Sequence, residues 1–263
     1  MPLPGPFGLP GSPPNWRFPL PAAPPFTLTN NFEGGTPGTT ITPANSGGIS
    51  GDAASAITFN GTGAVVRFSN AVSMLDSVCM ECVLGSVAGE AFWQWDHPTN
   101  PLSTAYFRLY LVLPTAPPAN IRIVAPQDSG GGARPRVLVT TARQIILTNT
   151  AGSTIATMTT PIPTNQLVRV EVLLVGSPTA GQLEARLYLD PSADVANFSD
   201  VVAVSGVDTG GAINRTRFGP NGATVANHTS YYDAIGLSAA NWLGPIPAPT
   251  WVPQVVSQYM GSH

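Results

Sequence analysis

Apolar and polar residues alternate with a period of two along much of this chain, most clearly between residues 166 and 190. Valine and leucine take every second position in 168–174, with Arg169 and Glu171 between them. Leucine and alanine alternate in 183–189 with Glu184, Arg186 and Tyr188. Because successive side chains of a strand point to opposite faces, each run has one apolar and one polar face. The short link at 176–181, which contains Gly and Pro, predicts an antiparallel pair with one face on a core and the other toward solvent or a partner.

The same alternation predicts further short strands, separated by clusters of Gly, Pro, Asn, Ser and Asp. In 104–113 it places Tyr106, Arg108 and Tyr110 together on a polar face. Strands spaced this evenly are typical of an all-β sandwich or barrel. The remaining predicted strands cover 56–60, 64–69, 76–84, 90–95, 120–125, 136–140, 143–147, 154–159, 215–219 and 230–238.

Composition agrees with a single large β domain. The 263 residues include 27 Gly and 28 Pro, and only 10% are charged, so long amphipathic helices are disfavoured. A net charge of -3 gives no electrostatic footprint for nucleic acid, and no apolar run is long enough to cross a bilayer. All 11 basic residues are arginine, which we interpret as the codon bias of a GC-rich genome.

The two ends of the chain differ in composition from its middle. Residues 1–28 hold ten of the prolines, and residues 244–263 are again Pro-rich, so both ends are expected to be extended arms around a domain at 29–243. Large apolar side chains along the first arm need a surface, either their own domain or, as we favour, a neighbouring subunit. These assembly residues are Phe7, Trp16, Phe18 and Phe26.

The cysteines, Cys79 and Cys82, form a Cys-x-x-Cys pair inside a predicted strand. Such a pair can be half of a zinc site or a redox pair, but no second pair accompanies it and the three histidines show no ligand spacing. An offset of three on a strand puts the two thiols on opposite faces. We therefore expect two small buried residues rather than a metal or redox site.

Two segments resemble the ends of concanavalin A-like (LamG-type) jelly-roll domains. Residues 31–35, with 45–48 and 50–53, are similar to the opening of these domains, and 217–219, with 231–238, are similar to their closing strand. The resemblance implies a jelly-roll β-sandwich over residues 29–243. It implies no single function, because that fold hosts lectins, hydrolases, lyases and scaffolds.

The N-terminus lacks the basic and apolar regions of a signal peptide, so we expect a protein made in a cytoplasm. With the Pro-rich apolar arms and the arginine-only basic residues, the whole resembles a virion protein of an actinobacterial tailed phage. A minor tail protein is the first expectation and a capsid-associated or decoration protein the second. The partners would then be other virion proteins and copies of itself.

The resemblance also suggests a structural calcium site at Glu33 and Asp233, since matching acidic residues in related modules help to hold calcium. Backbone carbonyls and Asp52 could supply some of the further oxygens that calcium requires. The alternative, which we favour, is that both carboxylates cap turns or bond backbone amides. No other cofactor is expected.

A glycan or interface face has two sequence candidates. Trp93 and Trp95 share one face of a predicted strand, where they could stack on sugar rings, although burial in the core is the favoured interpretation. Tyr106, Arg108 and Tyr110 form the second candidate, because Tyr and Arg are enriched at interfaces. A host cell-surface glycan is the partner that this alternative function, a carbohydrate-binding or receptor-binding module, implies.

No catalytic motif is present in the sequence. Glycoside hydrolysis needs two carboxylates across one bond, and Glu81, Glu90, Glu171 and Glu184 each lack a carboxylate partner two residues away. There is no Gly-x-Ser-x-Gly elbow, P-loop or His-Glu-x-x-His. We therefore expect a protein that is not an enzyme, and a degenerate hydrolase is the weakest hypothesis.

Overall fold

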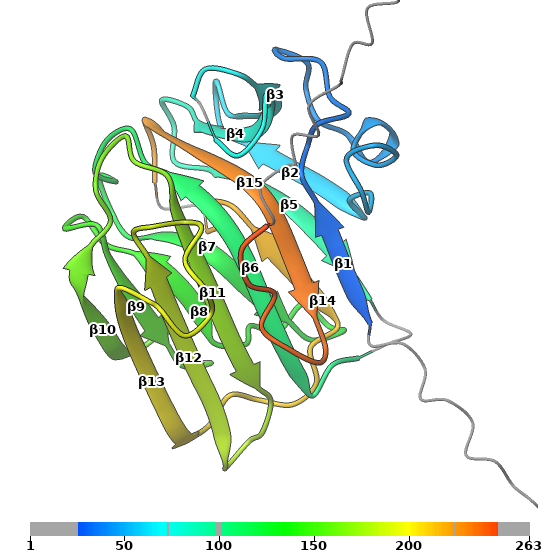
Figure 1. The fold of residues 1–263 in the computed structure, drawn as a ribbon. Coiled ribbons are helices and arrows are strands. Elements are labelled where there is room, and N and C mark those ends of the chain that lie inside the picture. The colour runs from blue at the N-terminus through cyan, green and yellow to red at the C-terminus, as the bar shows by residue number, and fades with distance from the viewer. Residues whose placement is uncertain (1–25, 73, 98–100, 223–224, 247–263) are drawn as a thin grey trace, which may run out of the picture.

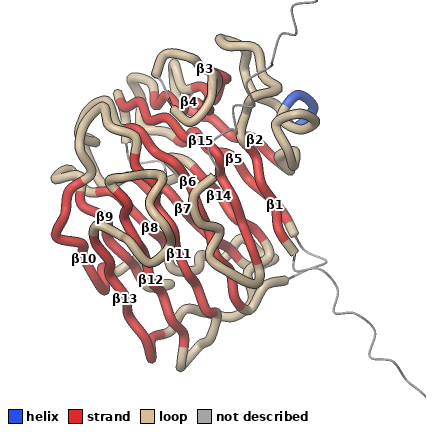
Figure 2. Tube along the Cα trace, in the orientation of Figure 1, coloured by secondary structure: helices blue, strands red, loops and turns tan. Residues whose placement is uncertain are grey.

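The computed structural model describes residues 26–72, 74–97, 101–222 and 225–246, which fold into two antiparallel sheets packed face to face (Figure 1). Strands and loops make up nearly all of the tube in Figure 2, with one short 3-10 helix, η1 (Pro43–Asn45). In the described ranges no helix is long and apolar enough to span a bilayer. The all-β jelly-roll sandwich expected from the sequence is confirmed.

The eight-stranded sheet is built around the last strand, which pairs with three others. Its order is β13 (Asp200–Val207), β12 (Gly181–Tyr188), β11 (Val168–Val175), β6 (Thr104–Val112), β15 (His228–Ser238), β4 (Cys79–Leu84) and β3 (Val65–Ser69), with β1 (Thr27–Asn30) paired to β15. The expected hairpin of residues 166–190 is the β11–β12 pair.

The seven-stranded sheet lies behind it. Its order is β10 (Thr154–Pro161), β9 (Gln144–Thr148), β8 (Arg136–Val139), β7 (Ile121–Gln127), β14 (Arg215–Phe218), β5 (Glu90–Asp96) and β2 (Ala56–Asn60). Most strand bounds fall within two or three residues of the sequence expectation. Strands β1 and β13 are not predicted. Strand β1 begins inside the segment expected to be an arm, and the outward positions of β13 carry Val201 and Ala203 as well, which hides the period of two.

The core lies between the sheets and takes the apolar face of every central strand. Val168, Val170 and Val172 of β11 face it, as the alternation predicts. Trp93 and Trp95 are 0% and 1% exposed, and their rings meet edge to face at 5.7 Å. They are core residues, so their candidacy for a glycan face was wrong. A strand whose neighbour is a second sheet buries its largest rings there.

The described parts of both arms lie on the domain itself. Strand β1 begins at Thr27, and the ring of the half-buried Phe26 lies 5.9 Å from that of His97, so Phe26 contacts its own domain, and its contact with a neighbouring subunit stays a prediction. Phe7, Trp16 and Phe18 lie outside the described residues, and their role stays a prediction. At the other end, Gly244–Ile246 lie across the eight-stranded sheet, where the orange-to-red trace folds back in Figure 1.

Candidate functional site

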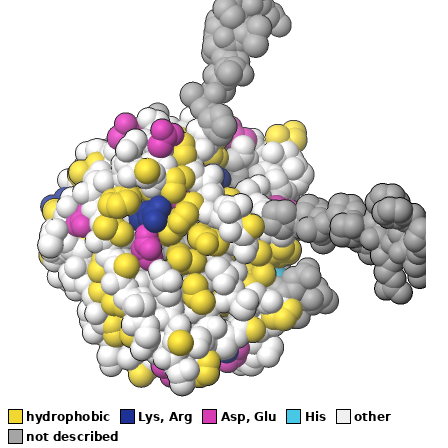
Figure 3. Space-filling model, turned by 60° about the horizontal axis from the view of Figure 1, so that its bottom comes forward, with side chains coloured by type: hydrophobic (Ala, Val, Ile, Leu, Met, Phe, Trp, Pro, Cys, Tyr) yellow, Lys and Arg dark blue, Asp and Glu magenta, His cyan; other side chains and the backbone are white. Residues whose placement is uncertain are grey.

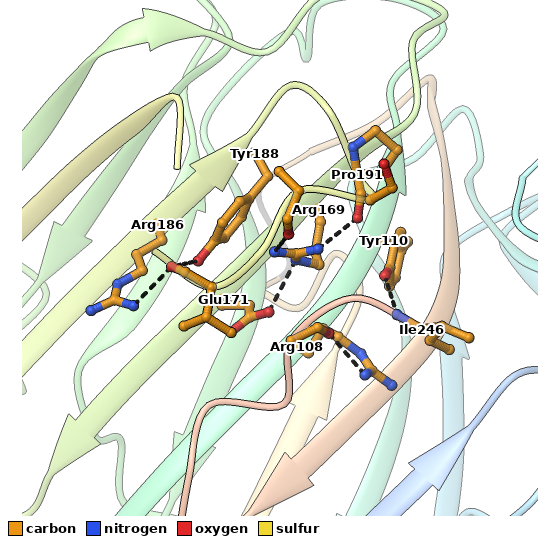
Figure 4. A network of polar contacts seen from close by, with 12 residues as sticks. Arg108, Tyr110, Arg169, Glu171, Arg186, Tyr188, Pro191 and Ile246 are labelled. Carbon is orange, nitrogen blue, oxygen red and sulfur yellow. Dashed lines mark hydrogen bonds and ion pairs between the residues drawn. The ribbon is translucent and has the colours of Figure 1, made fainter. Parts of the chain in front are cut away.

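Two rows of polar side chains cross the outer face of the eight-stranded sheet. In the first, Arg186 of β12 stands beside Glu171 of β11, which stands beside Arg108 of β6. In the second, the neighbours are Tyr188, Arg169 and Tyr110 on the same three strands. These rows are the polar faces that the sequence alternation predicts, brought into register by strand pairing. Figure 4 shows six of these side chains together.

The loop after β12 covers one end of these rows. Arg169 donates to the carbonyls of Pro191 and Ala193, both at 2.6 Å, and its guanidinium lies 3.8 Å from the centroid of the Tyr188 ring. It also forms an ion pair with Glu171 at 3.0 Å, and both side chains are fully buried. Burial raises the pKa of the Glu171 carboxyl, opposed by the charges of Arg169, Arg108 and Arg186. A polar face expected to meet solvent or a partner is therefore sealed by the chain itself.

The segment Trp242–Ile246, here called the strap, lies across the middle of the same face. Arg108 donates from Nη1 to the Gly244 carbonyl at 3.1 Å, and the Ile246 amide donates to the Tyr110 hydroxyl at 2.8 Å. Arg108 and Tyr110 are consequently buried under the strap. Of the three residues expected on this platform, only Tyr106 reaches the surface.

At the start of the strap, a cluster that we call the Trp242 patch brings aromatic rings together around Arg186. The Arg186 guanidinium lies 3.9 Å from the centroid of the Trp242 ring and 5.4 Å from that of Phe198. Tyr106 meets Trp242 edge-on at 5.2 Å, and Glu184 pairs with Arg186 at 2.6 Å. Near the middle of the face shown in Figure 3, hydrophobic side chains gather around basic and acidic ones.

Sequence reasoning missed most of this patch. The alternation of 183–189 places Glu184 and Arg186 on the outer face and so contains a usable signal. Nothing local indicates that Trp242, in the loop after β15, returns over β6 and β12, or that Phe198 approaches the same arginine.

Glu33 and Asp233 bond to backbone amides rather than to each other. Glu33, in the turn after β1, accepts from the Val78 amide and the Ser77 hydroxyl, both at 2.7 Å. Asp233 accepts from the amides of Ala234 at 2.7 Å and Leu75 at 3.3 Å. These are the capping contacts favoured from the sequence. Within the described ranges no three His, Cys, Asp or Glu side chains gather as a metal site, and calcium binding stays a prediction.

Burial is the largest cause of the pKa shifts of Asp233 on β15 and of Cys79 on β4. It raises the pKa of Asp233 to about 7, and the nearby carboxylates of Asp76 and Glu33 add to the shift. Burial likewise raises the pKa of the Cys79 thiol to about 12. Cys79 and Cys82 are free and buried in separate apolar clusters on opposite faces of β4, as the offset of three predicts.

No family model and no curated protein matches the chain. Among solved structures, the cellulose induced protein Cip1 has a TM-score of 0.56 at 18% identity, covering 81% of this chain and 97% of that one. The binding domain of Paraclostridial mosquitocidal protein 1 has a TM-score of 0.50 at 10% identity, and the match spans about half of it, 48%, and 81% of this chain. Arcelin-5, a lectin-like defense protein from Phaseolus vulgaris, has a TM-score of 0.41 at 9% identity, covering 82% of this chain and 98% of arcelin-5. The likeness to Cip1 shows the fold, a jelly-roll β-sandwich.

Proposed function

We propose that the chain is a carbohydrate-binding module and that the sugar binds at the Trp242 patch. The observation that carries the proposal is the group of the half-buried rings of Tyr106 and Trp242 and the exposed ring of Phe198 around Arg186 and Glu184, whose side chains are 17% and 14% exposed. A pyranose has an apolar C–H face and an edge of hydroxyls. Aromatic rings supply apolar planes for the first, and a guanidinium beside a carboxylate supplies donors and acceptors for the second.

The patch is also held in place before any ligand arrives. Arg186 is fixed by Glu184, by a bond from Nη1 to the Val195 carbonyl at 3.2 Å, and by the Trp242 ring. Ordering a long side chain on binding costs about 0.5–1.5 kcal/mol, and that cost is largely avoided when the side chain is already fixed. Phe198 and Val201, which are 37% and 38% exposed, extend the apolar surface at its rim. Exposed apolar clusters bordered by polar groups mark interaction sites.

The virion role expected from the sequence rests mainly on the terminal arms. Their described residues, 26–28 and 244–246, contact their own domain, and no comparison supports a phage origin. A minor tail or capsid role therefore stays a prediction. The fold also occurs in a protein named for induction by cellulose. The proposal does not depend on that name, because the patch alone carries it.

A glycan array probed with the full chain, followed by calorimetric titration of the hits, tests the proposal. Trp242→Ala should weaken binding by roughly thirtyfold, about 2 kcal/mol, as truncation of a central aromatic does in a binding site. Phe59→Ala is the matched control, because Phe59 is an aromatic residue 42% exposed on β2 of the other sheet.

Phe59→Ala should bind like the unmodified protein, and circular dichroism should show both variants folded. The proposal includes binding without turnover, so the bound glycan should be recovered uncleaved after long incubation. An array without hits, or equal affinity of Trp242→Ala and the unmodified chain, would refute the assignment of the patch.

A further inference from the structure

A second feature of the same face is a cleft on the β1 side of the strap. Its volume is about 540 Å³, within the range of small-molecule sites. Asn30, Asn31 and the 49–51 turn form one wall, Leu243, Pro245 and Ile246 of the strap form the other, and Arg108 and Ala234 lie between them. The strand order separates this cleft from the Trp242 patch, since β12 and β1 lie on opposite sides of β6.

Among the described residues that line the cleft, Arg108, which is 6% exposed, is the one with a charged side chain. Its Nε donates to the Ala234 carbonyl at 3.2 Å and its Nη1 to the Gly244 carbonyl at 3.1 Å. Both bonds are to neutral oxygens, so neither cancels the positive charge. The remaining guanidinium N–H groups, on Nη1 and Nη2, have no hydrogen bond to another described residue. Two parallel N–H groups of a guanidinium can bind the two oxygens of a carboxylate.

The surrounding charges leave an excess of positive charge. The outer-face network contains the guanidinium groups of Arg108, Arg169 and Arg186, against the carboxylates of Glu171 and Glu184. Glu171 forms an ion pair with Arg169, and Glu184 forms one with Arg186. Glu171 also lies beside Arg108 and acts on its charge, but no carboxylate of the described residues forms an ion pair with Arg108. Asp233 is also near enough to act on Arg108, but it bonds to backbone amides and its pKa is about 7.

The backbone is held in an unusual shape at the base of the cleft. Ala234 has φ 42°, in the left-handed region that costs an alanine roughly 1 kcal/mol, at a bulge between Asp233 and Gly236. This conformation presents its carbonyl to Arg108. At Gly236 an added Cβ would lie 3.0 Å from the Leu243 side chain, which is a tight contact, and 3.6 Å from Nη2 of Arg108, which is an ordinary one, so a larger residue would push against the strap. Strained backbone positions of this kind occur preferentially at functional sites.

We infer that this cleft binds a small ligand carrying one carboxylate and several hydroxyls, of the uronic acid class, with the carboxylate on Arg108. One guanidinium matches a single negative charge. The hydroxyls would meet the side chains of Thr29, Asn31 and Ser50, which are neutral and polar. This site shares the strap with the Trp242 patch but has its own lining, and it goes beyond the proposed function.

Calorimetric titration of the full chain with glucuronate, glucose and inorganic sulfate tests the inference. Glucuronate should bind at least about tenfold more tightly than glucose, the usual value of a hydrogen bond to a charged group. Arg108→Gln should lower the affinity for glucuronate to the affinity for glucose. Tyr110→Phe is the matched control, because it removes the strap bond to Ile246 and keeps the guanidinium, and it should change the affinity by no more than roughly threefold.

Equal affinity for glucuronate and glucose, or no glucuronate binding, would overturn the inference without any variant. Sulfate binding as tight as glucuronate would overturn the carboxylate assignment, since it would indicate a general anion site. If Tyr110→Phe and Arg108→Gln weaken glucuronate binding equally, the weaker binding comes from the disturbed strap and not from the lost guanidinium, which would overturn the inference. Phe198→Ala alters the Trp242 patch without changing a strap residue and should leave glucuronate binding intact, so failure here and failure of the proposed function are distinguishable.

Discussion

His228 and Asp233 lie five positions apart on β15 and should give this protein two opposing pH dependences. Neither ring nitrogen of His228 has a hydrogen-bond partner among the described residues, and burial lowers the pKa of the imidazole from 6.5 to about 4. Burial raises the pKa of the Asp233 carboxyl from 3.8 to about 7. Between about pH 4 and pH 7 the folded protein therefore keeps His228 as the neutral imidazole and Asp233 as the neutral carboxylic acid.

The sign for His228 follows from proton binding in the two states. Between about pH 6.5 and pH 4 the unfolded chain is protonated at this residue while the folded chain is not. The free energy of unfolding therefore falls as the pH falls through this window. Each unit contributes about 1.4 kcal/mol, so the whole window amounts to about 3 kcal/mol.

Asp233 acts in the opposite sense. Between pH 3.8 and about 7 the unfolded chain has lost the proton that the folded chain keeps. Its contribution to stability is complete below pH 3.8 and is lost as the pH rises, by about 4 kcal/mol in all. The two slopes nearly cancel between about pH 4 and pH 6.5. Each should become visible when the other residue is replaced.

Urea unfolding followed by tryptophan fluorescence, in steps of about one unit from about pH 4 to about pH 8, measures these slopes. Relative to the unmodified chain, His228→Leu should lose stability as the pH rises, and Asp233→Asn should lose stability as the pH falls. Comparing differences removes the titration of the other groups. If His228→Leu keeps the slope of the unmodified chain, the argument that His228 is buried as a neutral ring is refuted.

Two further predictions concern the outer face and the acidic residues. Arg169→Met leaves the buried Glu171 without its ion-pair partner and should lower the free energy of unfolding by about 3–5 kcal/mol, whereas adding Glu171→Leu should recover much of it. Urea unfolding measures both, and a loss below about 1 kcal/mol in Arg169→Met would contradict the burial of the pair. Glu33 and Asp233 already accept two hydrogen bonds each, so we expect no change in Tm between calcium and EDTA. A rise of more than about 2 °C with calcium would restore the calcium site.

The sequence by itself determined most of the strands and the face to which their side chains point. Alternation in 168–174 and 183–189 places Val170 inward and Arg169 outward, and the same pattern places Tyr106, Arg108 and Tyr110 on one face. The reason is local, because side chains alternate along any extended chain. The same rule places Cys79 and Cys82, which are three positions apart, on opposite faces of β4.

Only the tertiary structure decided which outward residues meet solvent. Arg169 points outward and is nevertheless sealed by the carbonyls of Pro191 and Ala193, while Arg108 and Tyr110 lie under the strap. These contacts join residues as far as 136 positions apart, and no local pattern encodes where a loop returns. Burial depends on what packs over a face, whereas alternation specifies only which face a side chain occupies. The composition of the Trp242 patch and the cleft is therefore a property of the folded chain.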